Sequence, residues 1–267
     1  RHACKIPYGK LCYSRYEVGD LMNYISDKAI IGTDSKIGMF SVVEDNVEIG
    51  EGCIIGHNVV IHAGTKIGNY VRIDDNAVVG KKPMRAANSI FKDEKELEPA
   101  VISDGCMIGT GVIVYACCSI GKATLIADMA TVRENVIIGC KTIIGRGAAV
   151  ENFCKVGSNC KIETNAYITA YSEIEDNVFI APGVVTSNDN YAGRSKERFN
   201  HFKGVTVKKG GRIGAQATIL PGKIIQEDGL VAAGSVVTKD VECENVVAGN
   251  PAKYLRKVPE EQLLKNQ

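Results

Sequence analysis

A six-residue period runs through most of this chain and constrains its fold more than any other feature. Isoleucine or valine recurs every six positions in three blocks, which begin at Ile31, Ile102 and Val207. An amphipathic helix repeats every 3.6 residues and a lone strand every two, so neither predicts a period of six. A fixed internal repeat of this kind indicates a solenoid.

The repeat has a second element, because a small or β-branched residue stands four positions after each aliphatic residue, as at Ser35, Cys118 and Ala148. Glycine often follows the aliphatic residue directly, where we expect it to let the chain turn. The pattern resembles the hexapeptide repeat of left-handed parallel β-helices, in which three hexads form one triangular coil. We therefore predict an all-β fold whose stacked coils pair at about 4.8 Å.

Two polar stretches interrupt the period and define the expected domain organisation. The β-helix is predicted over residues 25–247, with loops extruded at about 81–99 and 187–206. Residues 1–24 do not fit the repeat and remain unassigned. Residues 248–267 form a C-terminal tail, in which Pro259 predicts the start of a short helix.

Composition narrows the possible partners. The formal net charge is +1, so nothing indicates binding to nucleic acid or to an anionic membrane. No apolar run is long enough to cross a bilayer, and no secretory leader opens the chain. The cysteines show no zinc-ligand spacing, so we expect reduced thiols, no metal and a cytoplasmic protein. Five of the ten cysteines occupy the position four residues after the aliphatic one, which we call the small slot. They are predicted to fill the core: Cys53, Cys106, Cys118, Cys154 and Cys160.

One corner of the predicted prism differs from the other two. Positions eighteen apart stack, and one such column reads Tyr115, Arg133, Glu151 and Thr169, followed at the next position by Ala116, Glu134, Asn152 and Ala170. The second loop opens in the next coil. Because charged groups, an amide and a loop converge there, we take Glu151, Asn152 and Glu134 as catalytic candidates and Arg133 as a substrate ligand. A solvated edge or a subunit contact is the alternative. Glu163 and Asn165 line the neighbouring corner and are weaker candidates, with Asn165 as a substrate-binding candidate.

Several longer motifs resemble known enzymes. The segments "TSNDNYAGRS", "FKGVTVKKGGRIGAQATILPG", "VAAGSVVTKDV" and "VVAGNPAKYLRK", within 186–257, resemble the acyl-CoA half of nucleotide-sugar N-acetyltransferases. "LIADMATVRENVIIG" and "KTIIGRGAAVEN" are similar to the family that acetylates the 3-amino group of dTDP-3-amino-3,6-dideoxyhexoses. The resemblance implies acetyl-CoA as co-substrate, a nucleotide-sugar acceptor and a homotrimer with active sites between subunits.

The same resemblance assigns roles to individual residues. Those that would contact the sugar nucleotide or the pantetheine arm are Asn188, Asp189, Tyr191 and Arg194. Those whose backbone would meet pantetheine amides are Gly214, Ala215 and Ala233. Cations expected near coenzyme phosphates are Lys239, Lys253 and Arg256, and those that would meet a nucleotide diphosphate are Lys81, Lys82 and Arg85, for which a solvated surface is the favoured alternative.

The chain departs from its relatives at one position. Many related acyltransferases read V-E-H-D-C-x-I-G, whereas this chain reads V-E-N-F-C-K-V-G, with Asn152 in place of the usual histidine base. Attack of an amine on a thioester needs little acid help, so positioning and an oxyanion donor can supply much of the acceleration. Glu151 would accept the proton of the substrate ammonium, and Asn152 would position the amine or the thioester carbonyl.

Other functions remain open from the sequence. His57 and His62 have the spacing of γ-type carbonic anhydrases, but the third histidine that catalytic zinc requires has no place in the repeat. A non-enzymatic trimeric scaffold predicts no coenzyme-like ending. Within the acyltransferases, a 4-amino-sugar or O-acetyl acceptor is an alternative to the 3-amino sugar.

Overall fold

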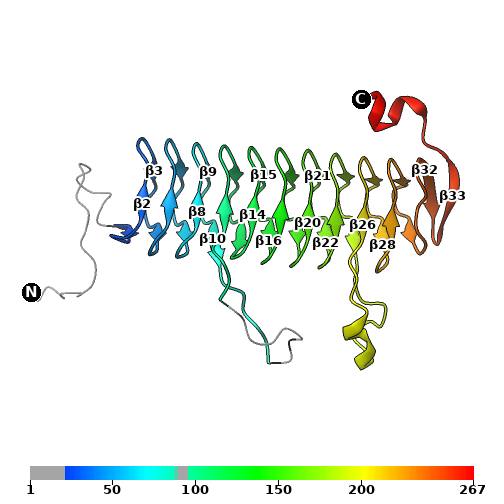
Figure 1. Ribbon diagram of the computed structural model, residues 1–267, viewed down its shortest axis with the longest axis horizontal. Coiled ribbons are helices and arrows are strands. Elements are labelled where there is room, and N and C mark those ends of the chain that lie inside the picture. Colours follow the sequence, from blue (N-terminus) through cyan, green and yellow to red (C-terminus); the bar gives the residue numbers. More distant parts are fainter. Residues whose placement is uncertain (1–21, 88, 90–95) are drawn as a thin grey trace, which may run out of the picture.

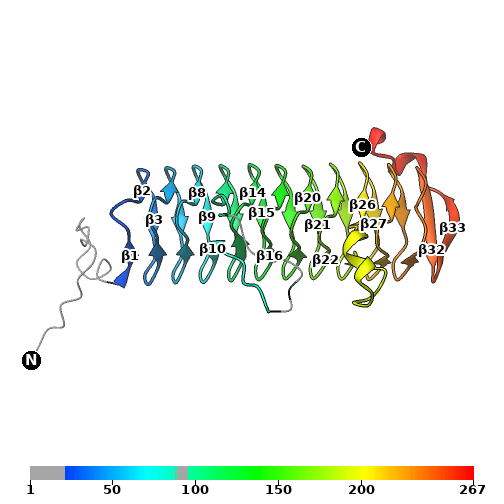
Figure 2. The ribbon, with the colours of Figure 1, turned by 60° about the horizontal axis from the view of Figure 1, so that its bottom comes forward.

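Three sheets built from parallel strands run along the prism and form its three faces (Figures 1 and 2). The computed structural model describes residues 22–87, 89 and 96–267, so most of the unassigned N-terminal segment lies outside the described residues. From β1 (Tyr24–Ile25) to β31 (Val236–Val237) the chain visits the three sheets in turn, mostly in strands of two residues. The predicted left-handed parallel β-helix is confirmed.

The strands are named here by sheet. Sheet A contains β1 (Tyr24–Ile25), β4 (Val42–Val43), β7 (Val60–Ile61), β10 (Val78–Lys81), β13 (Ile113–Tyr115), β16 (Thr131–Val132), β19 (Ala149–Val150), β22 (Tyr167–Ile168), β25 (Val185–Thr186), β28 (Thr218–Ile219) and β31 (Val236–Val237). Sheet B contains β2 (Ile30–Ile31), β5 (Glu48–Ile49), β8 (Lys66–Ile67), β11 (Val101–Ile102), β14 (Ser119–Ile120), β17 (Ile137–Ile138), β20 (Lys155–Val156), β23 (Glu173–Ile174), β26 (Thr206–Val207) and β29 (Ile224–Ile225). Sheet C contains β3 (Lys36–Ile37), β6 (Ile54–Ile55), β9 (Arg72–Ile73), β12 (Met107–Ile108), β15 (Leu125–Ile126), β18 (Ile143–Ile144), β21 (Lys161–Ile162), β24 (Phe179–Ile180), β27 (Arg212–Ile213), β30 (Leu230–Val231), β32 (Asn245–Gly249) and β33 (Ala252–Lys257).

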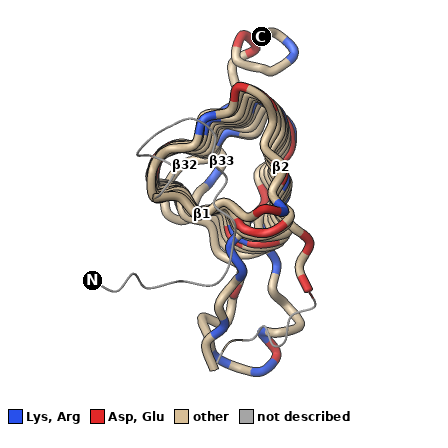
Figure 3. Tube along the Cα trace, turned by 90° about the vertical axis from the view of Figure 1, so that its left-hand side faces the viewer, with Lys and Arg blue, Asp and Glu red and all other residues tan. Residues whose placement is uncertain are grey.

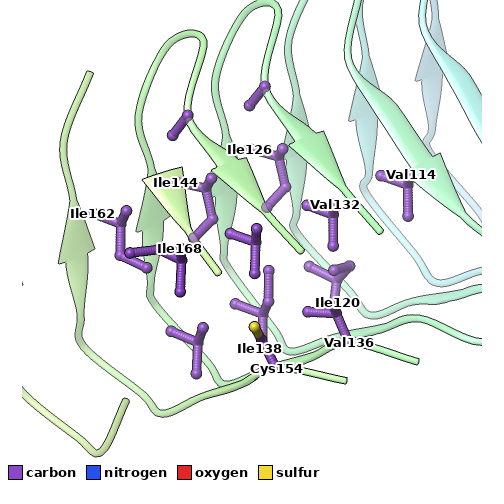
Figure 4. Close-up of a cluster of buried hydrophobic side chains, with 14 of the residues drawn as sticks. Val114, Ile120, Ile126, Val132, Val136, Ile138, Ile144, Cys154, Ile162 and Ile168 are labelled. Carbon is purple, nitrogen blue, oxygen red and sulfur yellow. The ribbon is translucent and has the colours of Figure 1, made fainter. Parts of the chain in front are cut away.

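The aliphatic residue of each hexad points into the prism and stacks on its equivalent one coil away. Val114 pairs with Val132, and Val132 pairs with Val150, along sheet A. All three are fully buried, and Figure 4 shows Val114 and Val132 lying with the isoleucines of the other two sheets in one continuous core. Burial of one aliphatic side chain contributes roughly 1.5–3 kcal/mol, so the repeat itself supplies the main stabilisation.

The small slot does more than the predicted filling of the core. The five cysteines expected there are buried and form no disulfide. Each thiol also donates a hydrogen bond to a corner carbonyl one coil further on, as Cys118 Sγ does to the Arg133 oxygen at 2.8 Å. Ser35 and Thr124 donate to Gly50 and Gly139 in the same way. The slot therefore favours small side chains that can also satisfy a carbonyl that the turn leaves without a backbone partner.

Glycine after the aliphatic residue has a different cause from the one that the sequence suggests. The left-handed backbone conformation falls two residues later, for example at Asn135 and Asn159, where φ is 60° and 56°. At Gly139 the neighbouring coil is the constraint, since an added Cβ would lie 2.6 Å from the carbonyl carbon of Gly157. Glycine is needed there for close approach between coils rather than for a positive φ.

The C-terminal end differs from the expected tail. Sheet C continues past residue 247, because β33 pairs antiparallel with β32 and covers the edge of the sheet. The short helix predicted after Pro259 consists of two single 3₁₀ turns, η3 (Glu260–Gln262) and η4 (Leu264–Asn266). Leu263 is buried with Val246 and Val258, so this tail is packed on the prism. Within the described residues, no helix has the length and apolar character needed to cross a membrane.

Candidate functional site

Both loops leave the prism from the same corner. The first loop follows β10 and the second follows β25, and both strands belong to sheet A. Figure 3 views the prism along its axis and shows the described parts of the two loops descending from one vertex. We call this vertex, where sheet A turns toward sheet B, the A–B corner. The predicted column lies between the two loops and comprises Tyr115–Ala116, Arg133–Glu134, Glu151–Asn152 and Thr169–Ala170.

Four alternating charges run along this corner. Arg85, from the first loop, donates from Nη2 to Glu134 Oε1 at 2.9 Å. Arg133 donates from Nε to Glu134 Oε2 at 2.9 Å and from Nη2 to Oε1 at 3.2 Å. Its remaining terminal nitrogen, Nη1, lies 3.4 Å from Glu151 Oε2. The face of Tyr115 lies beneath this guanidinium, with 4.9 Å between Arg133 Cζ and the ring centroid, which fixes its plane.

The two glutamates in this row of charges, Glu134 and Glu151, are in opposite electrostatic situations. Burial alone would raise the pKa of Glu134, but hydrogen bonds from Arg133 and Arg85 outweigh burial and hold that pKa below its usual value. Burial raises the pKa of Glu151, while Arg133 partly opposes the rise and Glu134 adds to it. The pKa of Glu134 is thus lowered and that of Glu151 is raised, so Glu151 is the better candidate of the two for exchanging a proton.

Asn152 stands at the floor of a small cavity next to Glu151. Its side chain is only 4% exposed, and its Nδ2 atom has no hydrogen-bond partner within the described residues. A cavity of about 160 Å³ lies against both side chains, and its other lining residues are Tyr167, Thr169, Ala170, Tyr171, Asn188 and Phe202. A buried N–H without a partner is costly, so this amide is suited to donating to a ligand atom in the cavity.

The second loop contributes only part of what the sequence assigns to it. It contains the 3₁₀ helix η2 (Lys196–Asn200). Asn188 lines the cavity, but Asp189 is engaged within the loop, accepting N–H groups from Tyr191 and Gly193 and lying 3.6 Å from Arg198. The Tyr191 ring stacks on His201 at 5.9 Å between centroids. Arg194 is exposed and does not line the cavity.

The remaining predicted residues lie elsewhere on the prism. Asn165 occupies the C–A corner, where sheet C turns toward sheet A, with φ of 58°. Asparagine tolerates this conformation better than most residues, so the turn accounts for it without a ligand.

The residues predicted for pantetheine gather at the same C–A corner, near the C-terminal end. Gly234 N–H donates to the Ala215 oxygen at 2.8 Å, and a Cβ added to Gly214 would lie 2.5 Å from Ala233 N. Lys253 and Arg256 are exposed on β33. Lys239 alone of this set follows a sheet A strand, β31. The pantetheine candidates Gly214, Ala215 and Ala233 are thus on a different corner of the chain from the Glu151 cavity.

Some lining residues were missed by sequence reasoning. Thr169 belongs to the predicted column, whereas Tyr167 does not. Tyr167 is the outward residue just before the core residue Ile168, so extending the column by the outward residue of each strand would have found it. The common corner of the two loops was also missed, although Val79 and Thr186 occupy the same phase. Phe202 lies in the aperiodic second loop and had no such signal.

The histidines considered for zinc are accounted for separately. Met39 N–H donates to His57 Nδ1 at 2.9 Å, and His62 Nδ1 lies 3.2 Å from Glu44. They follow β6 and β7 and so lie at different corners. Among the described residues no three His, Cys, Asp or Glu side chains gather in a way that could hold a metal ion.

Comparison with known proteins extends the fold to a family. The model described as "Bacterial transferase hexapeptide (six repeats)" matches residues 28–63, 135–170 and 154–188, and the "Hexapeptide repeat of succinyl-transferase" matches 46–81. The galactoside O-acetyltransferase of Escherichia coli (strain K12) is 32% identical over 139 residues, which are 47% of this chain and 68% of that protein. The chain belongs to the hexapeptide-repeat transferase family.

Longer relatives share less of their length. The bifunctional protein GlmU of Heliobacterium modesticaldum is 25% identical over 218 residues, which are 82% of this chain and 37% of that protein. The chain therefore spans little more than a third of this relative. The solved UDP-N-acetylglucosamine acyltransferase of Arabidopsis has the same fold, with a TM-score of 0.62 at 19% identity over 92% of this chain and 75% of that one.

Proposed function

We propose that the protein is an acyl-CoA-dependent N-acetyltransferase that transfers acetyl from acetyl-CoA to the 3-amino group of a nucleotide-linked amino-dideoxyhexose, with dTDP as the expected nucleotide. The observation that carries the proposal is the buried, unpartnered Nδ2 of Asn152 beside Glu151 in one small cavity. An amide donor and a carboxylate acceptor are the two groups that aminolysis of a thioester uses.

The proposed reaction follows from these two groups. Glu151 accepts a proton from the substrate ammonium, and its raised pKa brings it closer to the pH at which a general base is efficient. The neutral amine then attacks the thioester carbonyl, while Asn152 Nδ2 donates to the carbonyl oxygen as negative charge develops there. The carbon–nitrogen bond forms and the carbon–sulfur bond breaks. The leaving thiolate takes up the proton held by Glu151, and the attacking nitrogen then releases its second proton to Glu151, from which it passes to solvent.

Sheet A supports the proposed homotrimer. The outward residue that precedes the core aliphatic residue is uncharged in every sheet A strand, although β10 also ends at Lys81. These outward residues are Tyr24, Val42, Val60, Val78, Ile113, Thr131, Ala149, Tyr167, Val185, Thr218 and Val236. The outward positions of sheets B and C include Glu48, Lys66, Lys155 and Glu173, and Lys36, Arg72, Lys161 and Arg212, respectively. Interface cores are depleted of charge, so sheet A is the face suited to a second copy of the chain.

A trimer through sheet A also explains why the Glu151 cavity and the residues predicted for pantetheine lie at different corners of one chain. The A–B and C–A corners are the two edges of sheet A. Neighbouring copies would bring the Glu151 cavity of one prism to the Gly214 and Ala233 corner of the next. On this proposal pantetheine amides meet the backbone there, Lys239, Lys253 and Arg256 meet coenzyme phosphates, and the acceptor lies against Arg133, Asn188 and the second loop.

An O-acetyl acceptor is the second candidate. It is favoured by the similarity to galactoside O-acetyltransferase. A hydroxyl is a far weaker nucleophile than an amine and depends more on its base, so replacement of the usual histidine by Asn152 favours the amine.

Thiol release from acetyl-CoA with a panel of dTDP- and UDP-linked 3-amino, 4-amino and hydroxyl acceptors tests the proposal. Rapid release with a dTDP-3-amino sugar is the expected result. Release only with another acceptor retains an acyltransferase and removes the 3-amino assignment. No release with any acceptor, together with no binding of coenzyme A in calorimetry, favours the non-enzymatic scaffold.

A further inference from the structure

Glu134 is the most buried charged group of the candidate site, yet it does not line the cavity. Its side chain is 1% exposed, and both of its oxygens are occupied by guanidinium nitrogens. A group held in this way cannot reach a substrate amine. Its contacts instead join the first loop to the corner, because Arg85 and Glu134 are 49 residues apart in the sequence.

We infer that Glu134 and Arg85 are positioning residues: Glu134 holds Arg133 in place and anchors the first loop through Arg85, and the chain Arg85–Glu134–Arg133–Glu151 sets the charge state of Glu151. The role of Glu151 in this inference rests on the proposed function. The row of four paired charges does not, because it is observed in the structure. It moves Glu134 from the catalytic candidates to the supporting ones, and it gives Arg85 a role other than contact with a diphosphate.

Two arginines compensate the burial of Glu134. An ionised carboxylate removed from water loses several kcal/mol of solvation, which close and well-oriented charged partners offset. Arg133 approaches Glu134 with two nitrogens and Arg85 approaches it with one. Arg133 also faces Glu151, with its Nη1 atom 3.4 Å from Glu151 Oε2.

The groups that face Glu151 determine the sign of each change. Arg133 favours its ionised form, and Glu134 disfavours it. Tyr167 and Cys154 also lie near this carboxylate, but their pKa values are raised, so both stay neutral near pH 7. The cavity residues Asn152, Asn188 and Phe202 carry no charge. Arg85 therefore affects the pKa of Glu151 indirectly, because it offsets the negative charge of Glu134.

Two substitutions should shift the titration of Glu151 in opposite directions. Glu134→Gln removes the nearby negative charge and frees Arg133 for Glu151, so the pKa of Glu151 should fall. Arg85→Gln leaves Glu134 with a single partner, so the pKa of Glu151 should rise. Each shift should be on the order of half a pH unit to one unit, as for neighbouring charges that are partly exposed. Arg85→Lys should restore most of the wild-type value.

The titration can be measured without catalysis. Carboxyl ¹³C NMR of Glu-labelled protein, with Glu151→Gln to assign the resonance, reports the pKa of Glu151 in each variant. Lys82→Gln is the matched control, since it removes the same charge from an exposed neighbour of Arg85. Shifts of the same sign in Glu134→Gln and Arg85→Gln, or no shift in either, would overturn the inference.

A second measurement follows the first loop itself. The chain contains no tryptophan, and Met84 is 79% exposed next to Arg85. In a Met84→Trp background, fluorescence anisotropy should fall when Arg85→Gln or Glu134→Gln is added and should be unchanged by Lys82→Gln. Unchanged anisotropy in both test variants removes the anchoring role. Because Arg85 lies on the loop, Arg85→Gln keeps the test valid even where Glu134→Gln fails to fold.

The dependence of kcat/KM on pH tests whether the charge state of Glu151 matters for the reaction. The relevant part is the acidic limb, where activity falls as pH drops. It should move to lower pH in Glu134→Gln and to higher pH in Arg85→Gln, because the base acts when ionised. If the NMR shifts occur and the limb does not move, the chain of charges is real and Glu151 is not the base. In that case the proposed mechanism fails while the positioning inference stands.

Discussion

Two corners of the same coils have opposite uses. At the B–C corner, where sheet B turns toward sheet C, Gly121, Gly139 and Gly157 stack so closely that no side chain fits between them. At the A–B corner the equivalent positions carry Tyr115, Arg133 and Glu151. The backbone ladder is the same at both, since Gly139 N–H donates to Val156 at 2.8 Å and Arg133 N–H to Val150 at 2.9 Å. A solenoid can therefore keep its hydrogen bonds everywhere and reserve one edge for chemistry.

The first prediction concerns the B–C corner, where glycines stack. Gly139→Val places a branched side chain 2.6 Å from the backbone of the next coil, so the free energy of unfolding should fall by roughly 3 kcal/mol. Tyr115→Val at the A–B corner, where a Cβ is already present, should cost about 1 kcal/mol or less. Urea denaturation measures both. Equal losses at the two corners would show that the comparison is wrong.

The second prediction addresses the chemical corner. Glu151→Gln should lower kcat/KM by about 100-fold or more, as loss of a general base does, with stability nearly unchanged. Because the pKa of Glu151 is raised by burial, the wild-type rate should fall as pH drops through that raised value, above the range of a free glutamate. Glu173→Gln, on the exposed outward row of sheet B, is the matched control and should retain activity. A similar loss in both variants would remove Glu151 as the base.

The third prediction concerns the sheet beside the chemical corner. Ile113→Lys adds a charge to the outward row of sheet A and should weaken self-association by tenfold or more, which is about 1.4 kcal/mol. Ile137→Lys makes the same change on sheet B and should leave association intact. Sedimentation velocity over a range of concentrations gives the mass of each. Dissociation by Ile137→Lys alone would assign the interface to sheet B.

The smallest effect is expected inside the prism. Cys118→Ala removes the donor to the Arg133 carbonyl and should cost about 1 kcal/mol, whereas Cys118→Ser should cost less because its hydroxyl can donate as Ser35 does. Burial raises the pKa of Cys118 to about 12, so its thiol should also be unreactive in the folded protein. Denaturation and thiol titration test the two statements. A larger loss for serine than for alanine would mean that volume, not donation, governs the slot.

Much of the fold follows from sequence periodicity. The side chain of Ile120 or Val132 enters the core because each hexad must bury its aliphatic residue against the next coil. The same arithmetic stacks Arg133 on Glu151, so most of the site column was predictable. The C-terminal helix was predicted from Pro259 alone. The tail instead forms the strand β33, paired with β32, and two 3₁₀ turns, with Leu263 buried against Val246 and Val258.

What only the tertiary structure decided is how these groups are paired. The six-residue period determines which face of the chain each residue occupies, because that depends on neighbours a fixed number of residues away. It says nothing about Arg85 or Phe202, which lie in aperiodic loops and reach the corner through contacts across 49 residues or more than one coil. Charge pairing and burial depend on such distances in space, and they lower the pKa of Glu134 while raising that of Glu151.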